Sequence, residues 1–296
     1  MTLPDDLRFG LFLGQGGKDW GSILEGFQMA DELGYDYAWL VDHFVDTDGD
    51  LEKSCLEAWT LLAGIAALTS RVRLGVLVSS NTYRHPSLLA KEAVTVDHIS
   101  GGRLILGVGT GWHEPEHRMY GLPFPQAPER VDRLEEAVLV LDMLMRQERT
   151  SFEGRHYRLD DAPFEPKPLQ RPRIPLLIAA HRPRTLRLAA RYADMWDTFP
   201  AIPKAATEGL EEDMAGRMRK FEGYCREAGR DPSEVRRSTW TGGDALESEE
   251  AFLGFVDSYR PLGFTDFTTG LPSPQYTSTV RRIATEVIPA LKAGKA

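Results

Sequence analysis

The chain has 296 residues, of which 42% are hydrophobic and 27% are charged, and its formal net charge is −9. This composition is typical of a globular protein with a large core, and the acidic balance argues against nucleic-acid and anionic-membrane partners, which bind basic patches. The first ten residues are acidic and short of apolar side chains, unlike a signal peptide, and no uncharged stretch reaches the ~20 residues of a membrane span. We therefore expect a protein of the cytoplasm.

Short apolar segments alternate along the chain with segments whose apolar residues recur every three or four positions, the patterns of buried strands and amphipathic helices. The expected strands, in chain order, are 7–13, 35–42, 72–78, 103–109, 174–180, 193–199, 234–241 and 264–268. The expected helices are 20–33, 57–68, 86–100, 131–145, 186–193, 206–228, 247–260 and 278–292.

Eight alternating strand–helix units predict a parallel sheet, because parallel strands need crossover connections. Closed as a (β/α)8 TIM barrel, such units occupy about 250 residues, and the surplus falls in the connectors 112–127 and 148–173. The alternative is an open doubly wound sheet, but GQGGKDWG after the first strand does not fit the GxGxxG pattern that such a sheet carries. We expect one domain, 1–296.

In a (β/α)8 barrel the active site lies at the carboxyl ends of the strands. The second strand ends in Asp42 and His43; histidine exchanges protons near neutral pH, and an adjacent carboxylate can orient it. The third strand ends in Ser79 and Ser80, which can hydrogen-bond a heteroaromatic ring or simply form a turn.

Glycines and aromatic residues follow the fourth strand, where Gly109, Thr110, Gly111, Trp112 and His113 allow a flat ligand to approach the backbone, or form a tight turn. The fifth strand ends in Ala180, His181 and Arg182 before a helix, and a helix N-terminus beside an arginine is suited to a phosphate.

Other enzyme classes find little support in the sequence. The two cysteines, Cys55 and Cys225, form no CxxC pair, and no cluster has metal-ligand spacing, so we expect no metal. The GxSxG motif of serine hydrolases is absent. A metal-dependent barrel hydrolase stays a distant alternative, because GLFLGQGG lacks the histidines that such enzymes carry after strand one.

Taken together, the segments LVDHF, SGGRLILGVGTGW, YGLPFP, ERVDRLEEA, FEGRHYRL and LLIAAHRPRTLRLAARYADMWDTF resemble the luciferase-like monooxygenase superfamily along about residues 7–200. The resemblance implies a (β/α)8 barrel with insertions after strand four and near strand seven. It also implies a homodimer, and FMN or the deazaflavin coenzyme F-420 as the cofactor.

The resemblance also implies roles for individual residues. The pair Asp42 and His43 would be catalytic, with His43 exchanging a proton near the reacting carbon of the ring. A cis peptide bond between Val76 and Ser79 would back the ring. The remaining residues expected to bind the cofactor are Val78, Ser79, Ser80, Gly109, Thr110, Gly111, Trp112, His113, Tyr157, Ala180, His181 and Arg182, of which Tyr157 and the last three would reach the phosphate.

The sequence and the resemblance together predict an oxidoreductase that transfers hydride from reduced coenzyme F-420 to a small organic substrate. An FMNH2-dependent monooxygenase that uses molecular oxygen is the alternative within the family. An alternative of another class is a barrel that binds flavin without turnover, although a polar pair such as Asp42 and His43 argues against it.

Overall fold

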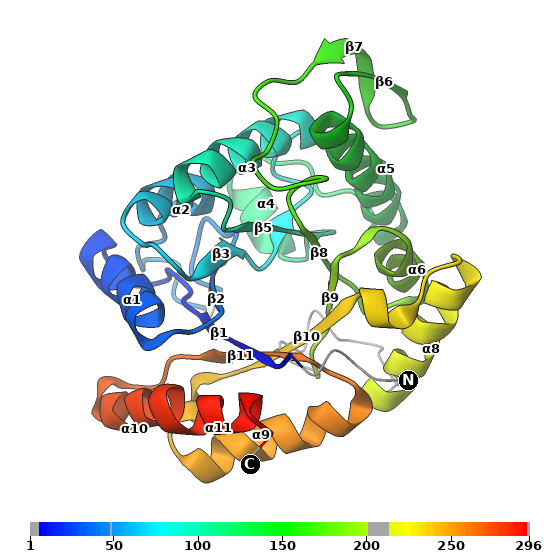
Figure 1. Cartoon of the computed structure of the whole chain (residues 1–296). Coiled ribbons are helices and arrows are strands. Elements are labelled where there is room, and N and C mark those ends of the chain that lie inside the picture. The colour runs from blue at the N-terminus through cyan, green and yellow to red at the C-terminus, as the bar shows by residue number, and fades with distance from the viewer. Residues whose placement is uncertain (1–5, 48, 201–212, 295–296) are drawn as a thin grey trace.

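Eight parallel strands form a closed barrel in the computed structural model, with helices around its outside (Figure 1). The structure describes residues 6–47, 49–200 and 213–294. Pairing between β3 and β5 closes the ring, so the predicted barrel is confirmed and the open sheet is excluded. The barrel strands are β1 (Arg8–Phe12), β2 (Tyr37–Leu40), β3 (Arg73–Val76) with its continuation β4 (Ser79–Ser80), β5 (Leu104–Gly109), β8 (Leu176–Ala179), β9 (Met195–Asp197), β10 (Arg236–Thr241) and β11 (Asp266–Gly270).

The strands are short apolar runs because both faces of the sheet are covered. All residues of β2 and β5 are buried. On β9, Met195 packs inside the barrel, whereas Trp196 packs outside it, stacked on Phe221 with ring centroids 4.1 Å apart. This alternation sends every second side chain at the end of a strand into the barrel mouth.

Helices cover the outside of the barrel, and their ends match the signals in the sequence. Asp19 caps α1 by accepting a 2.8 Å hydrogen bond from the Ser22 amide, and Gly34 ends that helix with φ 78°. The described α-helices are α1 (Trp20–Leu33), α2 (Ala58–Ala67), α3 (Pro86–Ser100), α4 (Glu114–Met119), α5 (Ala127–Arg146), α6 (Pro183–Tyr192), α8 (Met214–Glu227), α9 (Glu249–Tyr259), α10 (Thr277–Arg282) and α11 (Ile288–Lys292).

Both predicted connectors, 112–127 and 148–173, contain regular secondary structure. The connector predicted over residues 148–173 contains an antiparallel hairpin of β6 (Arg149–Glu153) and β7 (Arg158–Pro163) that projects from the barrel (Figure 1). The short helix α4 lies between β5, the fourth strand of the barrel, and α5, so the insertion after the fourth strand is present. Residues 201–212 lie outside the described residues, so the start of the predicted helix 206–228 and the insertion near strand seven stay predictions.

No helix among the described residues is long and apolar enough to cross a membrane.

Candidate active site

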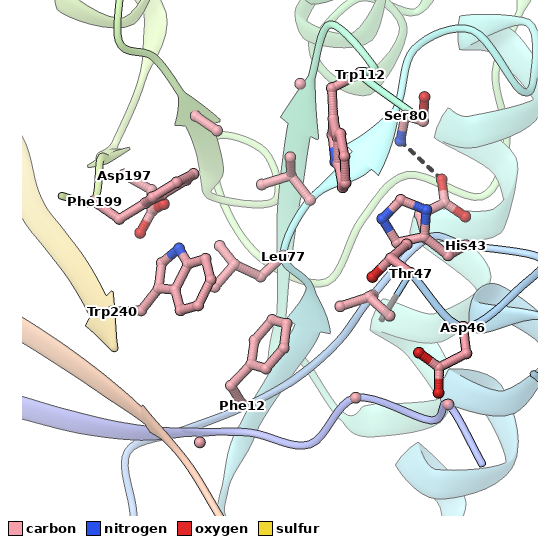
Figure 2. A pocket seen from close by; sticks show the side chains of 18 of the residues that line it. Phe12, His43, Asp46, Thr47, Leu77, Ser80, Trp112, Asp197, Phe199 and Trp240 are labelled. Carbon is pink, nitrogen blue, oxygen red and sulfur yellow. Dashed lines mark hydrogen bonds between the residues drawn. The ribbon is translucent and has the colours of Figure 1, made fainter. Parts of the chain in front are cut away.

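A cavity of about 660 Å³ opens at the carboxyl ends of the barrel strands, which is the end where barrel enzymes place their chemistry. Its volume lies within the range of pockets for cofactor-sized ligands. Figure 2 shows its labelled side chains in two groups on either side of Leu77. His43, Ser80 and Trp112 lie on one side, and Asp197, Phe199 and Trp240 lie on the other, with Phe12 below Leu77 in this view and stacked on Trp240.

A bulge in strand three forms the floor between these two groups. Leu74 pairs with Leu104, and Ser79 pairs with Val108, so five steps along strand three face four steps along β5. The Leu77–Val78 peptide bond within the bulge is cis, as the family resemblance implies. Both of its residues line the cavity and offer an apolar surface to a flat ligand.

Glycines on β5 make room for this bulge. A Cβ atom on Gly107 would lie 2.3 Å from the carbonyl oxygen of Val76, and one on Gly109 would lie 2.6 Å from Cγ2 of Val78. Any larger residue would displace the bulge, so these glycines in LILGVG serve close backbone packing.

Asp42 supports the bulge and does not orient His43, so the predicted pairing of these two neighbours is wrong. Its buried carboxylate accepts a 2.8 Å hydrogen bond from the Ser80 amide, which Figure 2 draws as a dashed line. The guanidinium of Arg84 donates to both carboxylate oxygens, at 2.7 and 3.1 Å. Asp42 therefore joins the ends of strands two and three, although it still lines the cavity.

The carboxylate that contacts His43 is Glu116 on α4, at 2.9 Å from Nδ1 of the imidazole. Glu116 is fully buried, and its oxygens also accept hydrogen bonds from Tyr83 and from the amides of Phe44 and Val45. Burial acts to raise the pKa of Glu116, but the hydrogen bonds from His43, Tyr83 and the amide of Phe44 outweigh it and lower the pKa to about 2.

An ionised Glu116 fixes the tautomer of the neutral imidazole. Because the carboxylate can only accept at Oε2, Nδ1 of His43 carries the proton and Nε2 keeps a free electron pair. The Trp112 ring packs edge-on against the imidazole, with centroids 5.6 Å apart, and restrains its orientation. His43 thus has the geometry of a group that accepts or returns a proton in the cavity.

His113 joins this cluster from the start of α4. The nitrogen and oxygen atoms of His43, His113 and Glu116 that could bind a cation lie within 4.8 Å of one another, although the sequence showed no metal-ligand spacing. Both oxygens of Glu116 already accept hydrogen bonds, so a cation would have to displace them. The expectation that no metal is bound stays a prediction.

The turn after β8 contributes His181 to the cavity. Burial lowers the pKa of His181 to about 3, and the nearby charges of Arg217 and Arg182 act in the same direction, so the ring is neutral. Its Nδ1 lies 2.9 Å from the hydroxyl of Thr198. Arg182 is exposed and precedes the first residue of α6.

The structure brings most of the predicted site residues into one cavity. Those that line it are Asp42, His43, Val78, Ser80, Gly109, Thr110, Gly111, Trp112 and His181. Four others contact neighbouring elements: Ser79 accepts a hydrogen bond from Trp59, Tyr157 accepts one from Asn81, Ala180 accepts one from Trp196, and His113 lies 3.6 Å from Glu116. The phosphate contacts expected of Tyr157, Ala180 and Arg182 stay predictions.

The sequence did not identify Glu116 as a site residue. It also did not identify four residues that line the cavity: Phe12, Asp197, Phe199 and Trp240. Glu116 lies in a predicted connector and the other four lie in predicted strands, where the alternation of side chains indicates only that some of them face the mouth. The polar strand end of ADMWDTF was the one signal for Asp197.

Comparison with known proteins is consistent with this geometry. Residues 7–242 match the family model of luciferase-like monooxygenases. A glucose-6-phosphate dehydrogenase of Microbacterium testaceum that depends on F-420 is 36% identical over 214 residues, which make up 71% of this chain and 61% of that protein. An F-420-dependent hydroxymycolic acid dehydrogenase of Mycobacterium tuberculosis is 31% identical over 245 residues, or 79% of this chain and 64% of the relative. The chain therefore spans less than two thirds of the length of each of these curated relatives.

Solved structures share the fold over almost the whole chain. An F-420-dependent secondary alcohol dehydrogenase, in complex with an F-420–acetone adduct, superimposes with a TM-score of 0.83 at 22% identity, covering 97% of this chain and 99% of the other. A monooxygenase from Streptomyces bottropensis superimposes with a TM-score of 0.73 at 24% identity, covering 96% and 99%. At these identities the likeness shows the barrel fold alone.

Proposed function

We propose, from the premise that the chain belongs to the luciferase-like monooxygenase family, that it is an oxidoreductase dependent on coenzyme F-420. It would transfer hydride between the deazaflavin ring and a carbonyl or alcohol carbon of a small organic substrate. The observation that carries this proposal is His43, held by a buried, ionised Glu116 beside the apolar bulge of strand three.

The residues around the bulge fit a flat tricyclic ring. Leu77 and Val78 supply an apolar floor, and the absence of a side chain at Gly109 leaves room for Val78. Ser80 and Thr110 add polar groups to the cavity lining. This mixture of an apolar face and few polar groups is typical of cofactor sites.

When bound, the reduced deazaflavin supplies the hydride, and carbon in place of nitrogen at its reacting position suppresses reaction with oxygen. The chain's own residues would position the reactants and move the proton. In the carbonyl-reducing direction, protonated His43 gives the proton from Nε2 to the forming alkoxide. In the alcohol-oxidising direction, neutral His43 accepts that proton, and Glu116 stabilises the resulting imidazolium.

The cofactor assignment is tested by titrating the protein with F-420 and with FMN, and by following absorbance and fluorescence. We expect retention of F-420 and hydride transfer to or from simple alcohols and ketones under anaerobic conditions. Retention of FMN with oxygen consumption would support the monooxygenase alternative. Retention of either ring without turnover would support the non-catalytic barrel.

Replacing His43 tests the proton step separately. His43→Ala should retain F-420 but lose roughly 10²–10⁴-fold in kcat, the usual contribution of general acid–base catalysis. His98→Ala is a matched control, because His98 is exposed on α3 and outside the cavity. Equal kcat values for the two variants would remove His43 from the mechanism.

We also propose that the protein is a homodimer of the cytoplasm whose partner is a small molecule, not a nucleic acid or a membrane. The family resemblance and the net charge of −9 support these expectations. Light scattering measures the oligomeric state directly.

A further inference from the structure

Asp197 is a buried acid that the proposed proton step does not use. It ends β9, where Met195 and Asp197 face the barrel interior and Trp196 faces the helices. The side chain lines the cavity, although the residue is only 1% exposed (Figure 2). Among the described residues, Oδ1 of Asp197 has no hydrogen-bond partner.

The surroundings of Asp197 favour a neutral carboxyl group. The flanking strands present Ala179 of β8, which is apolar, and Ser238 of β10, which is uncharged; both are register partners of Asp197. Asp266, deeper in the barrel, is a second acid. Burial raises the pKa of Asp197 to about 7, with Asp266 acting in the same direction and Ser238 opposing it. A protonated carboxyl can both donate and accept, unlike a carboxylate.

Aromatic rings surround the part of the cavity next to Asp197. Phe12 and Trp240 stack with centroids 5.3 Å apart and planes 6° apart, and Phe199 lies 4.8 Å from the Trp240 ring. Together with Asp197 these three residues form one subsite of the cavity, and Figure 2 shows Asp197, Phe199 and Trp240 on the far side of Leu77 from His43.

The charge of the cavity restricts what this subsite can bind. Lys18 is the only lysine or arginine among the described residues that line the cavity, and its Nζ donates to the carbonyl oxygen of Gly14 at 2.8 Å. An anionic substrate would therefore meet aromatic rings and an acid, with no described cation to pair with it in the subsite.

We propose that Asp197 binds a neutral hydroxyl or carbonyl group of the substrate within the subsite of Phe12, Phe199 and Trp240. The substrate is then an uncharged, mostly apolar alcohol or ketone with a second polar group. The reason is that the buried Asp197 carboxyl lines this subsite and, among the described residues, its Oδ1 has no hydrogen-bond partner, whereas buried polar groups are normally satisfied. The proposal rests on the proposed function for the identity of the reaction, but binding at Asp197 is measurable without it.

The test uses the full chain and three probes: cyclohexane-1,4-diol, cyclohexanol and glucose 6-phosphate. Calorimetry on the cofactor-free protein and on the F-420-loaded protein measures each dissociation constant. We expect the diol to bind roughly three- to tenfold more tightly than cyclohexanol, the gain from one net hydrogen bond. Glucose 6-phosphate should show no binding.

Two variants and a control assign the preference to Asp197. Asp197→Leu should remove the preference for the diol, whereas Asp197→Asn, which keeps a donor and an acceptor, should retain most of it. Thr239→Val is the matched control, because its hydroxyl is also buried without a partner on β10 but lies outside the cavity lining. Thr239→Val should bind the probes as the wild type does.

The binding measurements test the role of Asp197 separately from the proposed F-420-dependent activity. Three results would overturn the role of Asp197, even in a protein with F-420 bound and active. They are tighter binding of glucose 6-phosphate than of the diol, failure of every neutral probe to bind, and an unchanged preference for the diol in Asp197→Leu. Loss of the preference in Asp197→Leu supports that role, even in a protein that retains no F-420.

Discussion

Replacing Glu116 by glutamine tests whether this buried carboxylate sets the state of His43. The amides of Phe44 and Val45 can only donate, so the glutamine oxygen must face them and its NH2 group must take the place of Oε2. That NH2 group then faces Nδ1 of His43, which is 2.9 Å from Oε2 in the wild type. Two donors cannot face each other, so Nδ1 must become the acceptor.

The consequence is an inverted tautomer. In the Glu116→Gln variant, neutral His43 carries its proton on Nε2 and has no free electron pair at the nitrogen that we assign to the proton transfer. The imidazolium form also loses its counter-charge. We expect alcohol oxidation to slow by roughly 10²–10⁴-fold, the full contribution of the base, with cofactor affinity little changed. The lost charge-assisted hydrogen bonds should cost ~1.5–3 kcal/mol of stability.

The assay combines kinetics with nitrogen NMR of a histidine-labelled sample, which distinguishes the two tautomers. Glu114→Gln is the matched control, because Glu114 lies on the same helix with its side chain exposed. A Glu116→Gln protein that keeps the Nδ1 proton and the wild-type kcat would refute this reasoning. A variant that is merely unfolded would be recognised by lost thermal cooperativity.

Three further predictions concern the bulge and the buried acids. Arg84→Met leaves the Asp42 carboxylate buried without its cation, and chemical denaturation should show a loss of about 3–5 kcal/mol. Gly109→Ala places a methyl group 2.6 Å from Val78 and should weaken F-420 binding roughly tenfold, since overpacking costs ~1–3 kcal/mol; Gly223→Ala, with open space around it, should leave the dissociation constant unchanged. Asp197 holds its proton to about pH 7 when folded and to about pH 4 when unfolded, so its contribution to stability is lost as the pH rises through that window. Unfolding free energies of Asp197→Asn should lack this decline, and an identical pH dependence in both proteins would contradict the raised pKa.

Local patterns in the sequence were sufficient to predict the strands and helices of the barrel. Each strand is an apolar run and each helix has its own period and end signals, such as Gly34 after α1, so these elements follow from neighbouring residues. The hairpin of β6 and β7 was missed because its strands are mostly exposed and carry little apolar alternation, while nearby prolines indicated a loop. The glycines on β5 were visible, but the backbone contacts that require them were not.

The sequence by itself determined which residues stand at the carboxyl ends of the strands, because strand order and the barrel rule place those ends on one rim. It could not determine which side chains meet there. Asp42 is next to His43 in the chain but binds Arg84, whereas Glu116, 73 residues from His43, contacts its imidazole. The buried acid Asp197 likewise acquires its neutral surroundings only when β8, β9 and β10 align. Such contacts depend on the packing of distant elements, which only the tertiary structure decides.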